Sequence, residues 1–313
     1  MKVMRSSRTA LRGVLIAALS VLLSLGLVGT AGAAPATTGE RGSSTCADRP
    51  VPARAVSIQL WTFAEYIGFG TDAATQARHE EVLRRLSEMG YRNVEPFTLS
   101  GMSAEEYAEL LREYRLRAPA RHVGVGTPEE PADIAQILAE NRVLGVEYFG
   151  SGGTPQYTTE AEWVAYAEYL DAVGAQARRA GQWLMVHNHN WEFETTFGDR
   201  TAFDILMQHS ERRHLVSQLD LYWAVFAGAD PIDVIREYGN RIRLFHVKDL
   251  NEELDRRIEI VGRGDIDFGP IFRTAGGSTR YYVVEHDPRF GDPTFDPFEA
   301  AREGFAYLTC TSH

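Results

Sequence analysis

Residues 215–248 read LVSQLDLYWAVFAGADPIDVIREYGNRIRLFHVK, and their pattern is the clearest indication of the fold class. Short apolar runs at 215–221 and 242–247 are separated by a longer segment. Asp220 lies near the end of the first run, and His246 lies near the end of the second. Both side chains are suited to bind a metal ion or to transfer a proton. This alternation predicts two parallel strands joined by a helical crossover.

The same pattern extends in both directions along the chain. Candidate strands lie at 56–63, 92–97, 118–123, 145–150, 183–189, 215–221, 242–247 and 281–285. Between them, apolar residues recur at helical spacing, as in Val82, Leu83, Leu86 and Met89. Eight strands predict a single-domain (β/α)8 TIM barrel in the α/β class, with an open doubly wound sheet as the alternative. The chain has no GxGxxG after the first strand and no GxxxxGK, which argues against a nucleotide-binding sheet.

The composition is that of an ordinary globular protein. The 313 residues are 44% apolar and 24% charged, with 2 cysteines and a net charge of -11. This excludes disordered, collagen-like and disulfide-scaffold proteins, because the apolar content suffices for a large core.

The first 33 residues predict a secretory signal peptide. Four basic residues precede an uncharged apolar run at 13–29, and Ala31-Gly32-Ala33 follows as a small-residue cleavage site. A membrane anchor is the weaker alternative because the run is short for a bilayer. Without the signal, 28 basic residues face 43 acidic ones, a net charge of -15. We therefore expect a secreted or extracytoplasmic protein that binds no nucleic acid and keeps no stable membrane anchor. A homo-oligomer is compatible with this sequence.

Residues 34–54 predict a flexible leader, and the barrel is expected to occupy 55–313. Cys46 lies in this leader, and Cys310 lies 264 residues later. In an oxidising compartment the two could form a disulfide, and the alternative is two free thiols.

Almost every predicted strand ends in a titratable residue. In a parallel barrel these ends form one rim, where active sites lie. Buried charged groups need partners, so their convergence implies that they satisfy one another or hold a cation. The residues are Glu95, His122, His187, His189, Asp220, His246, Lys248 and Glu285.

Several motifs accompany these strand ends. They are GYRNVE at 90–95, HNHNWEF at 187–193, LDLYW at 219–223, AGADP at 227–231, HVKD at 246–249, GRGD at 262–265 and VEHD at 284–287. Together they resemble the xylose isomerase-like barrel superfamily, and more narrowly its sugar phosphate isomerase/epimerase family. The likeness runs in order through the whole chain that follows the signal.

The resemblance implies a divalent cation held at the strand ends. Asp220, His246 and Glu285 match the family's ligands, whereas His187 stands where many relatives have Glu, with His189 and Glu192 as competing ligands. A mixed set of imidazole and carboxylate donors favours Mn, Co, Zn or Fe over Mg.

The resemblance also implies enediolate chemistry on a sugar. Glu192 and Glu285 are the expected acid/base pair, with His189 and Lys248 as further catalytic groups. Four aromatic residues near strand ends are candidates for stacking on a sugar ring. The expected substrate contacts are Glu95, His122, Trp61 and Tyr222, and the other aromatic candidates are Phe63 and Trp223.

An exported acidic enzyme is poorly suited to a phosphorylated substrate. Gly262-Arg263-Gly264 could cradle a phosphate, but a turn explains these glycines equally well. We therefore expect a metal-dependent sugar isomerase or epimerase acting on an unphosphorylated sugar or keto-sugar. The alternatives are a lyase or hydratase for 3-keto-glycosides and a non-catalytic sugar-binding barrel. An endonuclease is disfavoured because it needs a basic groove.

Overall fold

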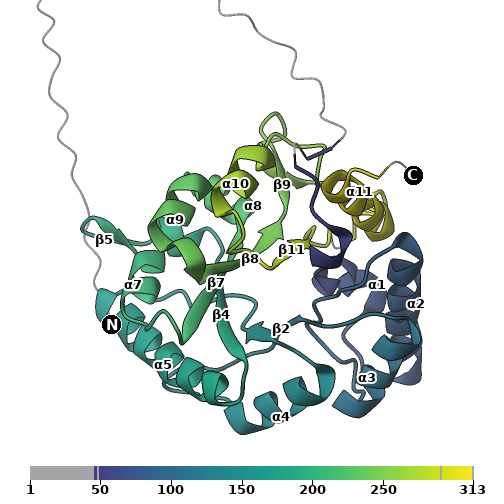
Figure 1. Ribbon diagram of the computed structural model, residues 1–313, viewed down its shortest axis with the longest axis horizontal. Helices are drawn as coiled ribbons and strands as arrows, with labels where there is room; N and C mark the ends of the chain where they lie inside the picture. Colours follow the sequence, from purple (N-terminus) through teal and green to yellow (C-terminus); the bar gives the residue numbers. More distant parts are fainter. Residues whose placement is uncertain (1–45, 48, 290, 312–313) are drawn as a thin grey trace, which may run out of the picture. The chain divides into compact units, whose positions relative to one another are not determined.

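Seven short parallel strands form the sheet of the barrel (Figure 1). The computed structural model describes residues 46–47, 49–289 and 291–311, so the predicted signal peptide and residues 34–45 of the leader lie outside the described residues. Every neighbouring pair of strands in this sheet is parallel. In spatial order the strands are β1 (Val56–Ile58), β11 (Tyr281–Val284), β8 (Ile242–Val247), β7 (Leu215–Asp220), β4 (Trp183–His187), β3 (Tyr148–Gly150) and β2 (Ala120–His122).

Residues 92–97 close the ring between β1 and β2. They form two isolated parallel bridges, Gln59 with Glu95 and Asn93 with Arg117, in place of the predicted regular strand. The Glu95 N–H donates to the Ile58 carbonyl at 2.8 Å. Pro96 follows and has no N–H with which to continue the ladder, which explains why the strand is irregular. Both edges of the sheet are joined, so the fold is the predicted (β/α)8 barrel and not an open sheet.

The longer helices surround this sheet (Figure 1). They are α2 (Ala73–Met89), α3 (Ala104–Glu113), α4 (Ile134–Leu144), α5 (Glu160–Arg179), α7 (Ala202–Gln208), α9 (Pro231–Tyr238), α10 (Phe268–Ala275) and α11 (Pro297–Thr309). Shorter helical turns lie in the loops, namely η1 (Ala53–Ala55), η2 (Leu60–Phe63), α1 (Ala64–Ile67), α6 (Trp191–Glu194), α8 (Leu221–Phe226) and η3 (Gly239–Arg241).

Helix α2 shows how the sequence sets the helix boundaries. The Asp72 carboxylate accepts the backbone N–H groups of Ala74 and Thr75, which caps the helix at its start. Gly90 ends it in the left-handed conformation, with φ of +106°. The predicted apolar face is confirmed, because Val82, Leu83 and Leu86 are fully buried.

Strand β1 is shorter than predicted. It ends at Ile58, and the chain turns at Leu60 into η2 instead of continuing to residue 63. The cause is Gln59, whose side-chain oxygen accepts the Trp61 N–H at 3.1 Å and so caps the turn. The turn carries Trp61 to the rim of the barrel.

Two hairpins that the sequence analysis did not predict lie in the loops. They pair β5 (Thr196–Phe197) with β6 (Arg200–Thr201), and β9 (Asp249–Asn251) with β10 (Arg257–Glu259). Strands of two or three residues leave too short a pattern to stand out in the sequence.

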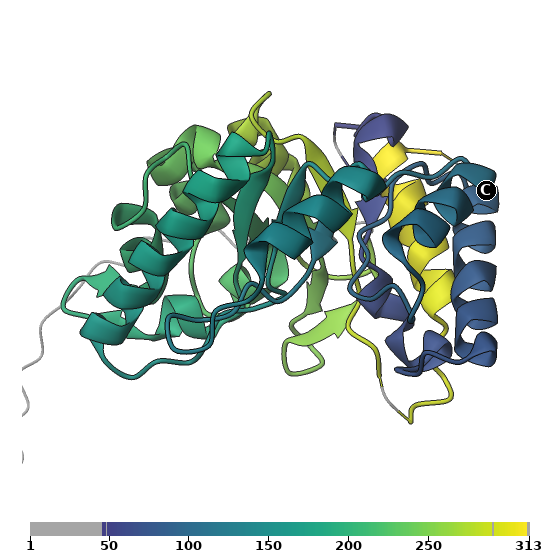
Figure 2. The same ribbon diagram turned by 90° about the horizontal axis from the view of Figure 1, so that it is seen from below.

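The start and the end of the described chain are joined. Cys46 and Cys310 form a disulfide with their Cα atoms 5.0 Å apart. The end of the predicted flexible leader is packed, because Ala47 and Val51 are buried and the Val51 N–H donates to the Leu308 carbonyl at 2.7 Å. Helix α11 lies beside α2 (Figures 1 and 2).

Within residues 46–311, apart from the gaps at 48 and 290, no helix has both the length and the apolar character needed to span a bilayer.

Candidate active site

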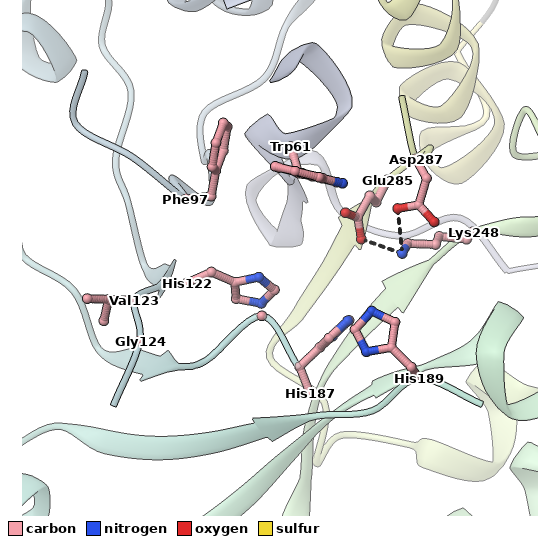
Figure 3. Close-up of a pocket in the computed structure, with 11 residues that line it drawn as sticks. Trp61, Phe97, His122, Val123, Gly124, His187, His189, Lys248, Glu285 and Asp287 are labelled. Carbon is pink, nitrogen blue, oxygen red and sulfur yellow. Dashed lines mark hydrogen bonds and ion pairs between the residues drawn. The ribbon is translucent and has the colours of Figure 1, made fainter. Parts of the chain in front are cut away.

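A cavity of about 340 Å³ opens where the barrel strands end (Figure 3). Six of the predicted site residues border it, and so do several residues that the sequence analysis did not single out. The lining consists of Trp61, Phe97, His122, Val123, Gly124, Gly152, His187, His189, Lys248, Glu285 and Asp287.

The predicted metal ligands converge beside this cavity. The His246 Nδ1 and Glu285 Oε2 atoms are 2.5 Å apart. Asp220 Oδ2 lies 4.0 Å from both His246 Nδ1 and His187 Nε2. These four side chains come from the ends of β4, β7, β8 and β11, and each is at most 3% exposed.

The donor atoms fit a divalent cation. His187 Nδ1 has no hydrogen-bond partner among the described residues, although it is buried. Asp220 Oδ2 likewise accepts no well-oriented hydrogen bond within the described part of the chain, although Lys248 Nζ is 3.1 Å away. Unsatisfied buried polar atoms are costly, and a bound cation would relieve this cost at Asp220. The mixed imidazole and carboxylate set is of the kind that transition metals accept.

Glu95 lies beneath the cavity and does not line it. Its carboxylate accepts hydrogen bonds from Gln59 Nε2 at 2.7 Å, Gln218 Nε2 at 2.6 Å and His246 Nε2 at 2.8 Å. Burial opposes ionisation of Glu95, but the neighbouring His122 and His246 outweigh it and lower the pKa of the carboxyl. Glu95 therefore lies outside the set of residues that border the cavity, and its expected contact with a substrate stays a prediction.

His246 is held between two carboxylates. Burial works against its charged form, yet Glu285 and Glu95 prevail and raise the pKa of His246 to about 10. His122 lines the cavity above Glu95, with its Nε2 atom 2.7 Å from Gln218 Oε1 and 3.1 Å from Glu95 Oε1. Burial lowers the pKa of His122 even though Glu95 opposes this shift.

Lys248 is the one lysine among the described residues that borders the cavity, and three carboxylates surround it. Its Nζ atom is 2.9 Å from Glu285 Oε2, 3.1 Å from Asp220 Oδ2 and 3.1 Å from Asp287 Oδ1. Burial disfavours the charge, but the carboxylates more than compensate and raise the pKa of Lys248 well above its usual range. Lys248 therefore carries a positive charge at the cavity wall.

His189 and Glu192 have different positions from those expected of a catalytic pair. His189 lines the cavity and stacks on Trp191, with ring centroids 4.3 Å apart. Burial lowers the pKa of His189 to about 3, so the imidazole is neutral. Glu192 lies behind it, fully buried, and does not border the cavity.

The contacts of Glu192 assign it a supporting position. One carboxylate oxygen accepts the His189 backbone N–H at 2.7 Å, and the other accepts the Thr154 hydroxyl at 2.5 Å. Burial raises the pKa of Glu192 to about 7. The Glu192 carboxylate thus contacts the backbone of His189 and does not border the cavity, and its expected acid/base role stays a prediction.

Only some of the aromatic candidates border the cavity. Trp61 lines the cavity, and the Phe97 ring meets it edge-on with centroids 5.1 Å apart. Tyr222 does not line the cavity. Its hydroxyl donates to the Arg256 carbonyl at 3.1 Å, in the turn between β9 and β10. Phe63 is fully buried, so it too is a packing residue. The Trp223 ring lies near His189, with centroids 5.5 Å apart, outside the set that borders the cavity.

Five residues that border the cavity were not predicted as site residues, namely Phe97, Val123, Gly124, Gly152 and Asp287. Asp287 follows Glu285 at an interval of two, the spacing that places side chains on one face of a strand, so the sequence carried a usable signal. The sequence signal for Phe97 was weaker, because Phe97 is only the last residue of the irregular segment at 92–97.

The glycines at 262 and 264 serve the chain itself. Their backbone N–H groups donate to the Asp249 carboxylate at 2.9 and 3.0 Å. A phosphate cradle is therefore not available at these two groups, because a carboxylate of the chain already uses them.

Comparison with known proteins places this architecture among enzymes of one family. Residues 83–309 match the family model described as the xylose isomerase-like TIM barrel. An inosose dehydratase from Clostridium perfringens is 29% identical over 154 residues, which is 43% of this chain and 51% of the relative. The chain thus spans about half the length of the curated relatives it matches.

Solved structures share the fold at low sequence identity. A sugar phosphate isomerase/epimerase from Parabacteroides distasonis has a TM-score of 0.66 and 21% identity, covering 83% of this chain and 94% of that one. A probable 3-DHS dehydratase from Bacillus anthracis has a TM-score of 0.59 and 11% identity, covering 81% of this chain and 98% of that one.

Proposed function

Because the chain belongs to the xylose isomerase-like TIM barrel family, we propose that it is an enzyme that removes the proton next to the carbonyl of a keto-sugar or keto-polyol and expels water. The relatives matched in sequence are named inosose dehydratases, which supports an elimination. The cavity volume suits one sugar-sized molecule.

The position of Glu192 argues against one arrangement for epimerisation, the pair formed by Glu192 and Glu285. Epimerisation needs proton-transfer groups on both faces of the reacting carbon, and Glu192 was the expected partner of Glu285. With Glu192 buried behind His189, one of these two carboxylates is withdrawn from the substrate space. Elimination of water can proceed with a single group, which accepts the carbon-bound proton and returns it to the departing hydroxyl.

We assign that role to His189. It borders the cavity, it is neutral, and its buried Nδ1 has no hydrogen-bond partner among the described residues. Lys248 would face the oxygen that gains negative charge when the proton leaves, because its ammonium is held at the same cavity wall. Trp61 and Phe97 would pack against the ring carbons of the substrate.

We propose that a divalent cation would be held by His187, Asp220, His246 and Glu285. Asp220, His246 and Glu285 form one group of candidate ligands, and His187 Nε2 lies 4.0 Å from Asp220 Oδ2. A cation bound there would polarise the substrate carbonyl and offset the negative charge of the reaction.

A sugar isomerase or epimerase is the second candidate. Its support is that His189 and Glu285 border the cavity from the ends of different strands, β4 and β11, so two proton-transfer groups face the substrate space. A proton taken by one group and returned by the other would invert the carbon.

We also propose that the protein is exported and acts on an unphosphorylated substrate. The signal-like sequence at 1–33, the Cys46–Cys310 disulfide and the net charge of -15 on the remaining chain support this. Mass spectrometry of the protein secreted by a bacterial host should find the amino terminus at or near residue 34. An intact residue 1 on all of the protein would contradict export by signal cleavage.

One experiment separates the two reactions. The purified protein is incubated in heavy water with a keto-inositol, a free ketose and a 3-keto-glucoside, each with Mn²⁺ or with EDTA. Elimination gives a conjugated enone that absorbs in the ultraviolet, or releases the aglycone, whereas epimerisation gives a deuterated isomer with no loss of water. We expect the first outcome, and we expect EDTA to abolish it. Deuterium exchange without elimination would favour the epimerase.

A further inference from the structure

We infer that the Lys248 ammonium occupies the carboxylate oxygens that a divalent cation would use, so that cation binding moves Lys248 onto Asp287 and into the substrate space. The inference rests on the proposed metal role of the site. It goes further by making Lys248 a resident competitor of the cation and Asp287 its alternative partner.

The contacts of Lys248 carry the first step. Two of its three carboxylate partners are candidate metal ligands, and the contacting oxygens are Asp220 Oδ2 and Glu285 Oε2, at 3.1 and 2.9 Å. The third partner, Asp287, belongs to none of the three groups of candidate ligands found in the described chain. Figure 3 shows Lys248 bonded to both Glu285 and Asp287 at the edge of the cavity.

Charge repulsion carries the second step. A cation bound to those two oxygens would lie within a few ångströms of Lys248 Nζ, and two like charges at about 4 Å repel by several kcal/mol even in a polar protein environment. The lysine stem has four rotatable bonds, so its charge can move while the backbone stays in place.

Burial determines which carboxylate would keep the Lys248 ammonium as its partner. A charge moved within a buried site needs a new or retained partner, because an unpaired buried charge is strongly destabilising. Asp287 is the retained partner, 3.1 Å away, and its side chain is 32% exposed, whereas those of Asp220 and Glu285 are almost fully buried. Asp287 therefore marks the more open side, toward the cavity that both residues line.

The same contacts explain how the site is stable without a cation. In that state Lys248 and His246 neutralise a carboxylate cluster that includes Asp220, Glu285 and Glu95. Under this inference, either the cation or the Lys248 ammonium neutralises the carboxylates of Asp220 and Glu285. Cation loading would also present Lys248 to the substrate, which couples the two events.

Calorimetric titration with Mn²⁺ tests the inference, with affinity as the readout. We expect Lys248→Met to bind Mn²⁺ at least about tenfold more tightly than the wild type, because the competitor is gone. We expect Asp287→Asn to bind about tenfold more weakly, because Lys248 then loses its partner in the cation-bound state. Lys248→Gln serves as a second neutral variant, and circular dichroism verifies that each variant is folded.

The double variant Lys248→Met/Asp287→Asn separates two explanations for Asp287. If Asp287 acts through Lys248, the second substitution has little effect once Lys248 is absent. If the loss from Asp287→Asn persists in full, Asp287 acts directly on the cation and its role as a partner of Lys248 is overturned.

The remaining outcomes are distinguishable. Equal or weaker Mn²⁺ binding by both Lys248→Met and Lys248→Gln overturns the competition while leaving the metal site in place. Absence of binding in the wild type and in both neutral variants instead contradicts the proposed metal role itself.

Discussion

The position of Glu192 bears most directly on the proposed proton transfer by His189. Its carboxylate holds the backbone N–H of His189 and the hydroxyl of Thr154, and Thr154 in turn accepts Trp191 Nε1 at 3.1 Å. These contacts fix the loop after β4 (Trp183–His187), from which His189 enters the cavity. We therefore propose that Glu192 positions His189, the side chain to which we assign the proton transfer.

Glu192→Gln should therefore lower kcat by about tenfold, because Gln keeps one acceptor oxygen and the shape of the side chain. Thr154→Val, which removes the hydroxyl that contacts Glu192, should act in the same direction. Steady-state kinetics on the substrate that the wild type turns over provides the measurement. A loss of a thousandfold or more in Glu192→Gln, with normal activity in Thr154→Val, would instead indicate direct proton transfer by Glu192.

His79 makes the stability depend on pH far from the active site. It is fully buried in α2 (Ala73–Met89), with Nδ1 2.8 Å from the Ser100 hydroxyl and Nε2 2.9 Å from the Tyr107 hydroxyl. Burial lowers the pKa of His79 to about 4, from 6.5 in the unfolded chain. Between these values the unfolded chain binds more protons, so folding stability falls as the pH drops from 6.5 to 4.

The shift corresponds to about 3 kcal/mol of stability, present above pH 6.5 and lost near pH 4. Urea unfolding of the wild type and of His79→Gln at several pH values measures it, because Gln keeps polar contacts but does not titrate in this range. We expect the wild type to lose about 3 kcal/mol more than the variant between pH 7 and pH 4. Parallel pH curves for the two proteins would contradict this assignment.

At the scale of elements, α5 (Glu160–Arg179) packs unusually closely against the chain before β7 (Leu215–Asp220). Gly174 lies inside this helix, and a Cβ atom there would be 2.3 Å from the His214 carbonyl oxygen. Glycine is poor in helix interiors, so the close approach explains its presence.

Gly174→Ala should thus destabilise the protein by about 1–3 kcal/mol, although alanine is the better helix former. Gly277→Ala is the matched control, because a Cβ atom at Gly277 has no neighbour within 4 Å in the described structure. Chemical unfolding compares the two variants. Equal stability of both with the wild type would show that α5 can move away from His214 without cost.

The elements also show what a sequence can predict. Strand ends were predictable because each apolar run stops at a polar residue, as at Asp220 and His246. The depth of a side chain was not, since Glu95 and Glu192 lie at the predicted places but one layer away from the cavity. Depth depends on hydrogen bonds between distant strands, such as that from Gln218 to Glu95, and a linear pattern contains no record of them.

At the scale of the whole molecule, the disulfide joins segments separated by 264 residues. Crosslinking so long a loop removes about 5 kcal/mol of unfolded-chain entropy in the simple loop-closure model. The double variant Cys46→Ser/Cys310→Ser should accordingly unfold at lower urea concentration, with a loss of up to about 5 kcal/mol. Reduction of the wild type by dithiothreitol should give the same shift, and an unchanged unfolding midpoint in both would show that α11 (Pro297–Thr309) holds without the bond.

The family and the barrel were both predictable from the motifs at the strand ends, and both are confirmed. The packing of Ala47 and Val51 against the end of the chain was not, because residues 34–54 have no periodic apolar pattern. Two isolated apolar residues find their partners only once α11 is in place.

The disulfide also imposes an order of events. A ribosome makes Cys46 long before Cys310, so this bond cannot form until every strand and helix between them has been synthesised. In the folded protein, Cys310 follows α11, which packs against β1 (Val56–Ile58). A thiol-reactive dye would therefore label molecules that lack the bond and leave the disulfide-bonded molecules unlabelled.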